Sequence, residues 1–305
     1  MKKIGNSYII GVDHGYGNIK TANHVFRTGV TGYDREPVFT NDTLVYNGRY
    51  YNIGEGRKEF TADKQSDDDY YVLTLAAMAM ELADENITEA SVIIAAGLPL
   101  TWTSGQMEAF AAYLTKNEYV AFTFRNMSYK LRILGARIYP QGYAAVADFA
   151  GAMDGVNMIA DIGNGTMNIL TVINGVPQMD RMFTEKFGGY QCTLRVREAF
   201  MRKTHRVIDD AIIDEVLING TADIRASDLE IVTDAASEYV DELFRHLREH
   251  GYDESTMTLY ITGGGYCLVR NFGCFDPERV VLIDDICAAA KGYEFLAELQ
   301  LNSKA

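Results

Sequence analysis

Two stretches of this sequence place an aspartate and two glycines between apolar segments. Both follow the order apolar strand, Asp-x-Gly-x-Gly, apolar strand. They are Tyr8–Lys20 (YIIGVDHGYGNIK), with Asp13, Gly15 and Gly17, and Met158–Leu170 (MIADIGNGTMNIL), with Asp161, Gly163 and Gly165. The repetition predicts two related lobes, each with a β-hairpin that carries an acidic side chain, and with the two hairpin tips facing each other.

The residue types at these tips suit the binding of phosphate and a divalent cation. Glycine permits positive φ in a tight turn, and backbone N–H groups in such a turn can form a nest for an anion. An aspartate at each tip can hold Mg²⁺ directly or through water, because Mg²⁺ takes one or two carboxylates together with phosphate oxygens. A single motif would favour an ordinary hairpin, but two copies in matching contexts favour a nucleotide and its metal.

Two further side chains could take part in this chemistry. Lys20 lies just past the first turn, where its ammonium could reach phosphates as a point charge; the alternative is a solvated lysine at a strand end. Pro140 is predicted to begin a helix of small residues, since proline is common at the first helical position. Gln141 would then lie at the N-terminal end of that helix, where it could orient a water for attack on a terminal phosphate or serve only as a polar cap.

Two more glycine runs precede predicted helices. Gly188 and Gly189 come before a helix over Cys192–Arg202, where free N–H groups could meet a ligand, although the pair could equally form a turn. The run Gly263–Gly265 separates a strand from a helix and would let the backbone lie against a planar ring or a phosphate. It fits poorly to a dinucleotide-binding motif, which needs G-x-G-x-x-G and an acidic residue after the next strand.

Hydrophobic periodicity and turn residues predict the elements that position these residues. Besides the two Asp hairpins, the expected strands are Leu44–Tyr51 (a hairpin around Asn-Gly), Ala90–Leu98, Tyr119–Phe124, Tyr129–Tyr139 and Val280–Ile283. The expected helices are Tyr70–Glu85, Gln106–Thr115, Cys192–Arg202, Ile208–Ile218, Ile231–Glu249 and Cys287–Leu299.

The composition is that of a globular protein with room for two domains. The chain has 305 residues, 48% hydrophobic and 23% charged, which is ordinary for a soluble fold. A formal charge of −14 argues against an extended surface for direct nucleic-acid binding, which needs a basic patch. The same charge is compatible with a basic protein partner.

The four cysteines form no C-x-x-C pair and, without a leader segment, indicate reduced thiols in the cytoplasm. No apolar run approaches the ~20 residues that cross a bilayer.

Taken in chain order, these motifs resemble those of the actin, DnaK-type chaperone and sugar-kinase superfamily. The segments that resemble its phosphate 1, connect 1, phosphate 2, adenosine and connect 2 motifs are Asp13–Lys20, the segment at Gln141, Asp161–Gly165, Gly263–Gly265 and Ile283–Gly292. The resemblance covers the chain from Tyr8 to about Gly292. Within the superfamily, VDHGYGNIK, ADIGNGTMNIL, FGGYQCT and YITGGG are most similar to the ParM/StbA plasmid-segregation actins of bacteria.

This resemblance implies an α/β actin-like ATPase fold, with two ribonuclease-H-like lobes around a nucleotide cleft. Residues 1–144 and 284–305 would form domain I, and residues 145–283 domain II. ATP/ADP or GTP/GDP would bind between the hairpins with Mg²⁺, which Asp13 and Asp161 would hold through water, while Gln141 would place the attacking water. The residues that would contact the nucleotide are Gly15, Tyr16, Gly17, Asn18, Lys20, Gly163, Asn164, Gly165, Thr166, Gly188, Gly189, Gly263, Gly264 and Gly265.

Proteins of this family polymerise head to tail with nucleotide bound, and hydrolysis loosens the filament. The resemblance therefore implies a nucleotide hydrolase whose dynamic filaments segregate plasmid DNA. Its partners would be further copies of itself and a DNA-binding adaptor of the ParR type on a centromere-like site, without direct contact to nucleic acid or membrane. One position departs from the pattern: ParM proteins often carry a catalytic Glu in connect 1, where this chain has Gln141, as actins do.

Two other functions would use the same fold. A sugar or small-acid kinase would need an aspartate base near the γ-phosphate, and the sequence has neither a D-x-G-G-T signature nor a zinc-bearing cysteine cluster. A chromosomal actin-like scaffold linked to a membrane would need a basic amphipathic tail, which Phe295–Ala305 does not provide. A filament-forming hydrolase is therefore the main hypothesis.

Overall fold

The computed structural model describes residues 1–38, 42–56, 68–99 and 104–303. The chain divides into two compact units, one formed by Met1–Asp148 with Cys287–Ala305 and the other by Phe149–Ile286. The division falls after Asp148 and before Cys287, where the sequence suggested 144 and 284. Each unit has its own hydrophobic core.

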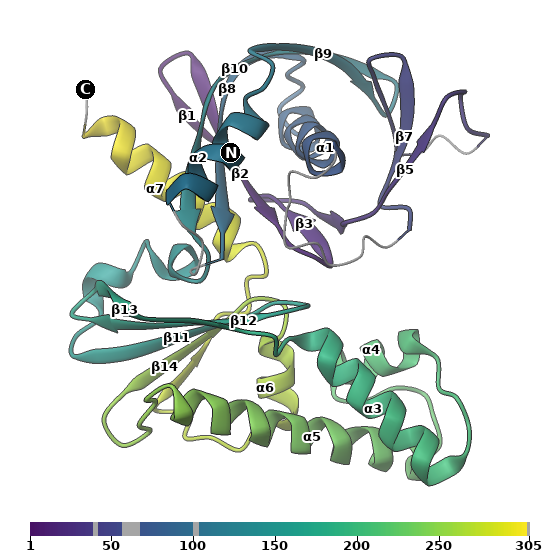
Figure 1. Ribbon diagram of the computed structural model, residues 1–305, viewed down its shortest axis with the longest axis vertical. Coiled ribbons are helices and arrows are strands. Elements are labelled where there is room, and N and C mark those ends of the chain that lie inside the picture. The colour runs from purple at the N-terminus through teal and green to yellow at the C-terminus, as the bar shows by residue number, and fades with distance from the viewer. Residues whose placement is uncertain (39–41, 57–67, 100–103, 304–305) are drawn as a thin grey trace. The chain divides into compact units, whose positions relative to one another are not determined.

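The first unit is built on one strongly curved, mixed sheet (Figure 1). Its described strands are β1 (Lys2–Ile4), β2 (Ser7–His14), β3 (Asn18–Lys20), β4 (Val25–Arg27), β5 (Val30–Tyr33), β6 (Thr43–Tyr46), β7 (Arg49–Ile53), β8 (Glu89–Leu98), β9 (Tyr119–Phe124) and β10 (Met127–Pro140). The spatial order is β4-β3-β2-β8-β10-β9-β6-β7-β5, with β1 paired to β2. Strands β2, β8 and β10 are parallel to one another, and the remaining pairs are antiparallel.

Helix α1 (Asp69–Ala83) lies inside the ring of strands, as Figure 1 shows almost end-on. The sequence predicted a helix here with an apolar stripe. The helix is confirmed, but every residue from Tyr70 to Leu82 is buried, so that all of its faces are covered. A helix that is apolar all round is typical of such a position. Its burial makes α1 the centre of this unit's core.

Helix α7 (Ala288–Asn302) returns to the first unit and packs directly on its backbone. It contacts β2, β8 and the short 3₁₀ turn η1 (Tyr143–Val146). A Cβ built on Gly292 would lie 1.8 Å from the carbonyl oxygen of Ala144, and one built on Gly11 would lie 2.1 Å from the carbonyl oxygen of Ala290. Glycine is therefore required on both sides of this contact. Helix α2 (Ser104–Leu114) packs elsewhere, on β10.

The helix predicted to begin at Pro140 is not formed. Pro140 is the last residue of β10, and only the 3₁₀ turn η1 follows, from Tyr143. Parallel pairing of Pro140 with Leu98 of β8 keeps the backbone extended. A proline at the end of a strand loses no ladder hydrogen bond that a central position would need, so the tertiary pairing prevails over the local helix signal.

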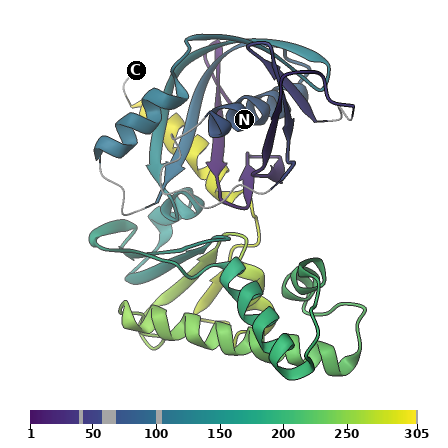
Figure 2. The same ribbon diagram turned by 45° about the vertical axis from the view of Figure 1, so that its right-hand side comes forward.

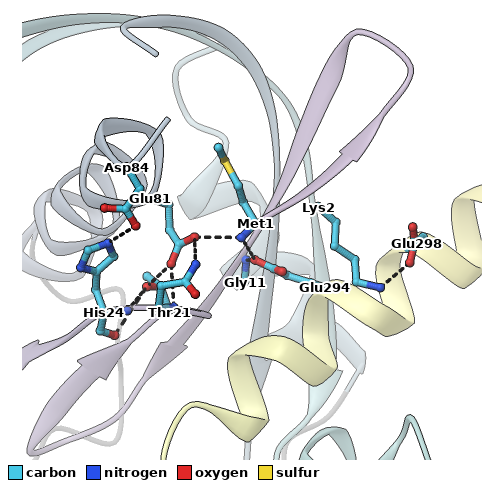
Figure 3. Close-up of polar contacts among 10 residues, drawn as sticks. Met1, Lys2, Gly11, Thr21, His24, Glu81, Asp84, Glu294 and Glu298 are labelled. Carbon is cyan, nitrogen blue, oxygen red and sulfur yellow. Dashed lines mark hydrogen bonds and ion pairs between the residues drawn. The ribbon is translucent and has the colours of Figure 1, made fainter. Parts of the chain in front are cut away.

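Buried charges link the N-terminal strand, α1 and α7 (Figure 3). The Met1 ammonium lies 2.8 Å from Glu81 of α1 and 3.5 Å from Glu294 of α7. Glu81 also accepts hydrogen bonds from the Thr21 hydroxyl at 2.6 Å and from the backbone and side-chain nitrogens of Asn23 at 2.9 Å. Glu294 accepts one from the Gly11 N–H at 2.9 Å. Buried carboxylates need such partners, because burying an uncompensated charge is costly.

The second unit is a sheet covered on one face by helices (Figure 2). Its described strands are β11 (Val156–Ile162), β12 (Met167–Ile173), β13 (Val176–Glu185), β14 (Thr258–Thr262) and β15 (Val280–Leu282), in the order β13-β12-β11-β14-β15. Its helices are α3 (Gly189–Thr204), α4 (Asp210–Asn219), α5 (Ala226–Glu249) and α6 (Tyr266–Phe272), besides a 3₁₀ turn, η2 (Ala150–Ala152). Strands β11, β14 and β15 are parallel, as expected where helical connections lie between strands. None of the described helices is both long and apolar enough to cross a bilayer.

The glycine contact of α7 yields a stability prediction. We expect Gly292→Ala to lower the free energy of unfolding by about 2–3 kcal/mol, because the new methyl group overpacks against backbone that cannot rotate away. Gly105→Ala is the matched control, since Gly105 is also helical and a Cβ there meets nothing within 4 Å; it should change stability by less than about 0.5 kcal/mol or raise it. Urea denaturation of both variants measures the difference. Equal free energies of unfolding would contradict the close contact between Gly292 and Ala144.

Glu294 yields a prediction for the pH dependence of stability. Burial raises the pKa of Glu294 to about 7 from an ordinary value of 4.5, and the nearby Met1 ammonium opposes this effect. A carboxyl whose pKa is higher in the folded chain binds its proton more tightly there, so its contribution is full below pH 4.5 and is lost as the pH rises through 7. Glu294→Gln should therefore gain stability relative to the wild type over this range. Denaturation curves between pH 4.5 and 8 test this. Glu298→Gln, a change at a half-buried glutamate on the same helix that pairs with Lys2, is the control, and the pH dependence of its stability should follow that of the wild type.

Candidate functional site

Asp13 forms the centre of a small polar cluster in the first unit. It lies at the end of β2, opposite Lys20 of β3 in the antiparallel register. The Lys20 ammonium is 3.3 Å from one carboxylate oxygen of Asp13, and the Gln141 side-chain amide donates to the other at 3.3 Å. The Asp13 residue is only 7% exposed. The structure thus brings together three of the residues predicted from the sequence, and it sets a carboxylate, an ammonium and an amide around one point.

The position of Gln141 follows from strand pairing rather than from a helix. Its backbone N–H donates to the carbonyl of Leu98 at 2.8 Å, which continues the parallel pairing of β8 and β10. Asp13 and Gln141 therefore lie at the carboxyl ends of two parallel strands, β2 and β10, that flank β8, and α/β sheets place functional residues at such strand ends. The role predicted for Gln141 does not need the helix that was expected to carry it.

The turn after Asp13 is held from two sides. The Thr28 hydroxyl donates to the Gly15 carbonyl at 2.7 Å, and the Thr28 N–H donates to the Gly17 carbonyl at 3.0 Å.

His14, the residue after Asp13, connects this strand to α1. It is fully buried, and its Nε2 lies 2.7 Å from the hydroxyl of Thr74 on α1. Since that hydroxyl donates to the Tyr70 carbonyl, His14 Nε2 is the donor. Neither Thr28 nor His14 was predicted from the sequence, because only the fold brings their partners near.

The remaining residues predicted on this hairpin lie in the turn or, for Asn18, at the start of β3. Tyr16 is half-buried, and burial raises the pKa of its phenol; Asn18 is exposed. Gly15 does not have the positive φ that the turn was expected to use. A Cβ at this position would instead lie 2.5 Å from the Asn18 carbonyl oxygen. Close approach of backbone is therefore the reason for glycine here.

In the second unit, Asp161 lies beside the glycine run that follows β14. Parallel pairing sets Asp161 of β11 opposite Thr262. Gly263, the next residue, has φ +82°, and a Cβ there would lie 2.5 Å from a carboxylate oxygen of Asp161. Gly265 donates its N–H to the Ile162 carbonyl at 2.8 Å. The structure thus places this predicted glycine run against the Asp161 strand, and among the predicted site glycines only Gly263 has positive φ.

The glycine pair at the start of α3 is docked on the Asp161 hairpin. The N–H of Gly189 donates to the Gly163 carbonyl at 3.0 Å, and that of Tyr190 donates to the Asn164 carbonyl at 2.8 Å. The Gly188 N–H is taken by the Gln191 side chain at 2.9 Å. These three helix-terminal donors are therefore used within the protein. The pair thus forms the start of α3, which is docked on the Asp161 hairpin.

Each hairpin, taken by itself, has groups that suit a hydrated magnesium ion and phosphate. In the described part of the chain, no three His, Cys, Asp or Glu side chains gather into a metal-binding group. Asp13 and Asp161 are thus single carboxylates at strand ends, which suits an ion that keeps several waters and takes further oxygens from phosphate. Lys20 adds a positive charge beside Asp13, and Gly264 is exposed with open space where a side chain would be. Gly17, Gly165 and Thr166 lie in the same two turns.

The contrast between Gly263 and Gly264 yields a prediction. We expect Gly263→Ala to lower the free energy of unfolding by about 2–3 kcal/mol, because it combines a strained positive φ with a clash against Asp161 and Ile162. Gly264→Ala, one residue on, should stay within about 0.5 kcal/mol of the wild type, since its Cβ meets nothing within 4 Å. Thermal or urea denaturation of the two variants compares them directly. Equal destabilisation of the two variants would contradict the steric difference between Gly263 and Gly264.

Comparisons with known proteins agree with this architecture. Residues 11–143 match the family model of the actin like proteins N terminal domain. No curated protein sequence matches the chain. Among solved structures, the apo psk41 ParM protein is similar over 98% of this chain and 99% of its own, with a TM-score of 0.74 and 15% identity.

Two further structures are similar over almost the whole chain. The archaeal actin homologue Ta0583 has a TM-score of 0.77 and 18% identity, over 96% of this chain and 99% of its own. ParM of Bacillus thuringiensis, solved with ATP, has a TM-score of 0.71 and 13% identity, over 97% of this chain and 100% of its own. Identities this low establish the fold alone, so the chain has an actin-like fold, and residues 11–143 are similar to the N-terminal domain of actin-like proteins.

Proposed function

We propose that this actin-like protein hydrolyses ATP or GTP and assembles into nucleotide-dependent filaments that segregate plasmid DNA. The observation that supports this most is the cluster of Asp13, Lys20 and Gln141 at the ends of parallel strands. Asp161 holds the equivalent place on the second hairpin. The likeness to ParM runs the length of both chains and supports a filament over other uses of the fold. The similarity to the Alp12 filament structure supports the same conclusion.

In this proposal each hairpin contributes phosphate- and metal-binding groups. Asp13 and Asp161 hold Mg²⁺ through water, and bound Mg²⁺ supplies charge neutralisation of the phosphates. Lys20 contacts phosphate as a point charge. Residues of the two turns and the glycine runs line the nucleotide; they are Gly15, Tyr16, Gly17, Asn18, Gly163, Asn164, Gly165, Thr166, Gly188, Gly189, Gly263, Gly264 and Gly265. Gly188 and Gly189 would contact the nucleotide through atoms other than their N–H groups, because those N–H groups already donate hydrogen bonds within the protein.

Gln141 is the residue we assign to the attacking water. Its amide nitrogen donates to Asp13, which fixes the side chain and leaves the amide oxygen as an acceptor for a proton of water. A glutamine in this role orients the water without removing its proton outright. The partners in this proposal are further copies of the chain and a ParR-type adaptor bound to DNA, so the acidic chain itself needs no nucleic-acid surface.

Light scattering with parallel phosphate release tests the proposal. Adding Mg-ATP to the purified protein should raise right-angle scattering, and the signal should decay as phosphate appears, whereas Mg-ADP should produce no lasting rise. Mg-GTP, run beside Mg-ATP, identifies the preferred nucleotide. A flat trace with steady phosphate release would contradict filament assembly and would point to a small-molecule kinase or another non-polymerising hydrolase.

Two variants separate binding from hydrolysis in this assay. Asp161→Asn should abolish both scattering and phosphate release, because the carboxylate charge for the metal is lost while the shape is kept. Gln141→Ala should still assemble but should release phosphate about 10²–10³-fold more slowly, so its filaments should persist. Unchanged phosphate release in Gln141→Ala would remove its assigned role.

A further inference from the structure

Tyr239, in the middle of α5, contacts the turn that leads into α3. It is 1% exposed, and its hydroxyl donates to the Gly188 carbonyl at 2.7 Å. Its ring stacks on that of Phe187, with centroids 4.3 Å apart and planes 6° from parallel. The Arg195 guanidinium lies 5.4 Å from the Tyr239 ring centroid. The side chain is thus fixed both by its ring and by its hydroxyl.

The carbonyl that Tyr239 binds belongs to the same peptide unit as the Gly189 N–H. That N–H donates to the Gly163 carbonyl in the Asp161 hairpin at 3.0 Å. Because the peptide unit is planar and rigid, a hydrogen bond that fixes its oxygen also fixes the direction of its N–H. The Tyr239 hydroxyl is therefore connected to the hairpin turn through one peptide plane.

This peptide has no room to take up another position. A Cβ at Gly188 would lie 2.6 Å from the Asn164 carbonyl oxygen and 2.7 Å from that of Gly163, so the two backbone segments are already in direct contact. The neighbouring Tyr190 N–H donates to Asn164 at 2.8 Å. A change in the tilt of the 188–189 peptide would therefore be passed to the turn at Gly163 and Asn164.

We propose that Tyr239 is a positioning residue for the Asp161 hairpin, which its hydroxyl holds in the conformation that binds nucleotide, through the Gly188–Gly189 peptide. The inference rests on the proposed function of the hairpin. A phenylalanine would fill the same core volume, so the hydroxyl is the part of the side chain that carries this role. Burial raises the pKa of the Tyr239 phenol above its ordinary value, and the group stays a hydrogen-bond donor throughout the physiological range.

Tyr239→Phe tests the proposal, with Tyr252→Phe as the matched control. Tyr252 is 5% exposed in the same core, and its hydroxyl makes no hydrogen bond with any residue in the described ranges. In Tyr239→Phe, we expect the Kd for a fluorescent (methylanthraniloyl) ADP with Mg²⁺ to rise about five-fold, the effect of one lost hydrogen bond. Amide hydrogen exchange of the nucleotide-free protein should also be faster at Gly189 and in the turn at 163–166. Tyr252→Phe should match the wild type in both measurements.

The two readouts distinguish positioning from a purely structural role. A Tyr239→Phe protein with a lower Tm but a wild-type Kd and wild-type exchange in the turn would overturn the proposal. A wild-type chain that binds neither the ADP analogue nor its GDP counterpart would instead overturn the proposed function, and exchange at Gly189 would still show whether the hydroxyl holds the peptide. Faster exchange and weaker binding in Tyr239→Phe, with neither change in Tyr252→Phe, would support both the positioning role of Tyr239 and the proposed function.

Discussion

Parallel pairing of strands is the interaction on which the candidate site depends. In the first unit, β2 and β10 both pair in parallel with β8, in a register that matches Val12 with Ala96 and Pro140 with Leu98. The carboxyl ends of the three strands therefore reach one edge of the sheet, and residues 128 positions apart in sequence share a hydrogen bond there. In the second unit, the pairing of β11 with β14 does the same for Asp161 and Gly263. The apolar runs of these strands hold this register because a shift by one residue would turn buried side chains outward.

Close contact between backbone segments is the second feature common to both units. Gly292 and Gly11 let α7 lie on the first unit without intervening side chains, and Gly188 does the same for the start of α3 against the Asp161 hairpin. At these positions the cost of glycine in the unfolded state is offset by contacts that no other residue permits. Contacts of this kind between backbone segments leave no side chain that could repack around a defect.

Hydroxyl groups from distant elements fix the two hairpins. The Thr28 hydroxyl donates to the Gly15 carbonyl in one unit, and in the other the Tyr239 hydroxyl donates to the carbonyl of the Gly188–Gly189 peptide, whose N–H binds the turn at Gly163. Turns rich in glycine have many accessible conformations, and a ligand that must first order such a turn binds more weakly. A buried hydroxyl at each turn reduces the number of conformations that the turn can adopt, which is a form of preorganisation and agrees with the proposed function.

The sequence by itself determined the elements whose signals are local. Both Asp hairpins, helix α1 and the strand–glycine–helix segment at Gly263 could be predicted, because turn residues and hydrophobic periodicity act over a few positions. Motif order also indicated the actin-like fold.

The tertiary structure decided what depends on distant partners. Pro140 ends a strand instead of beginning a helix, because β8 pairs with it, and the N–H groups at the start of α3 donate to the Gly163 turn. It also decided that α1 is buried on every side and that Tyr239 reaches Gly188. No spacing in the sequence encodes these contacts, because each of them joins residues that are far apart in sequence and that meet only when the core of their unit has formed.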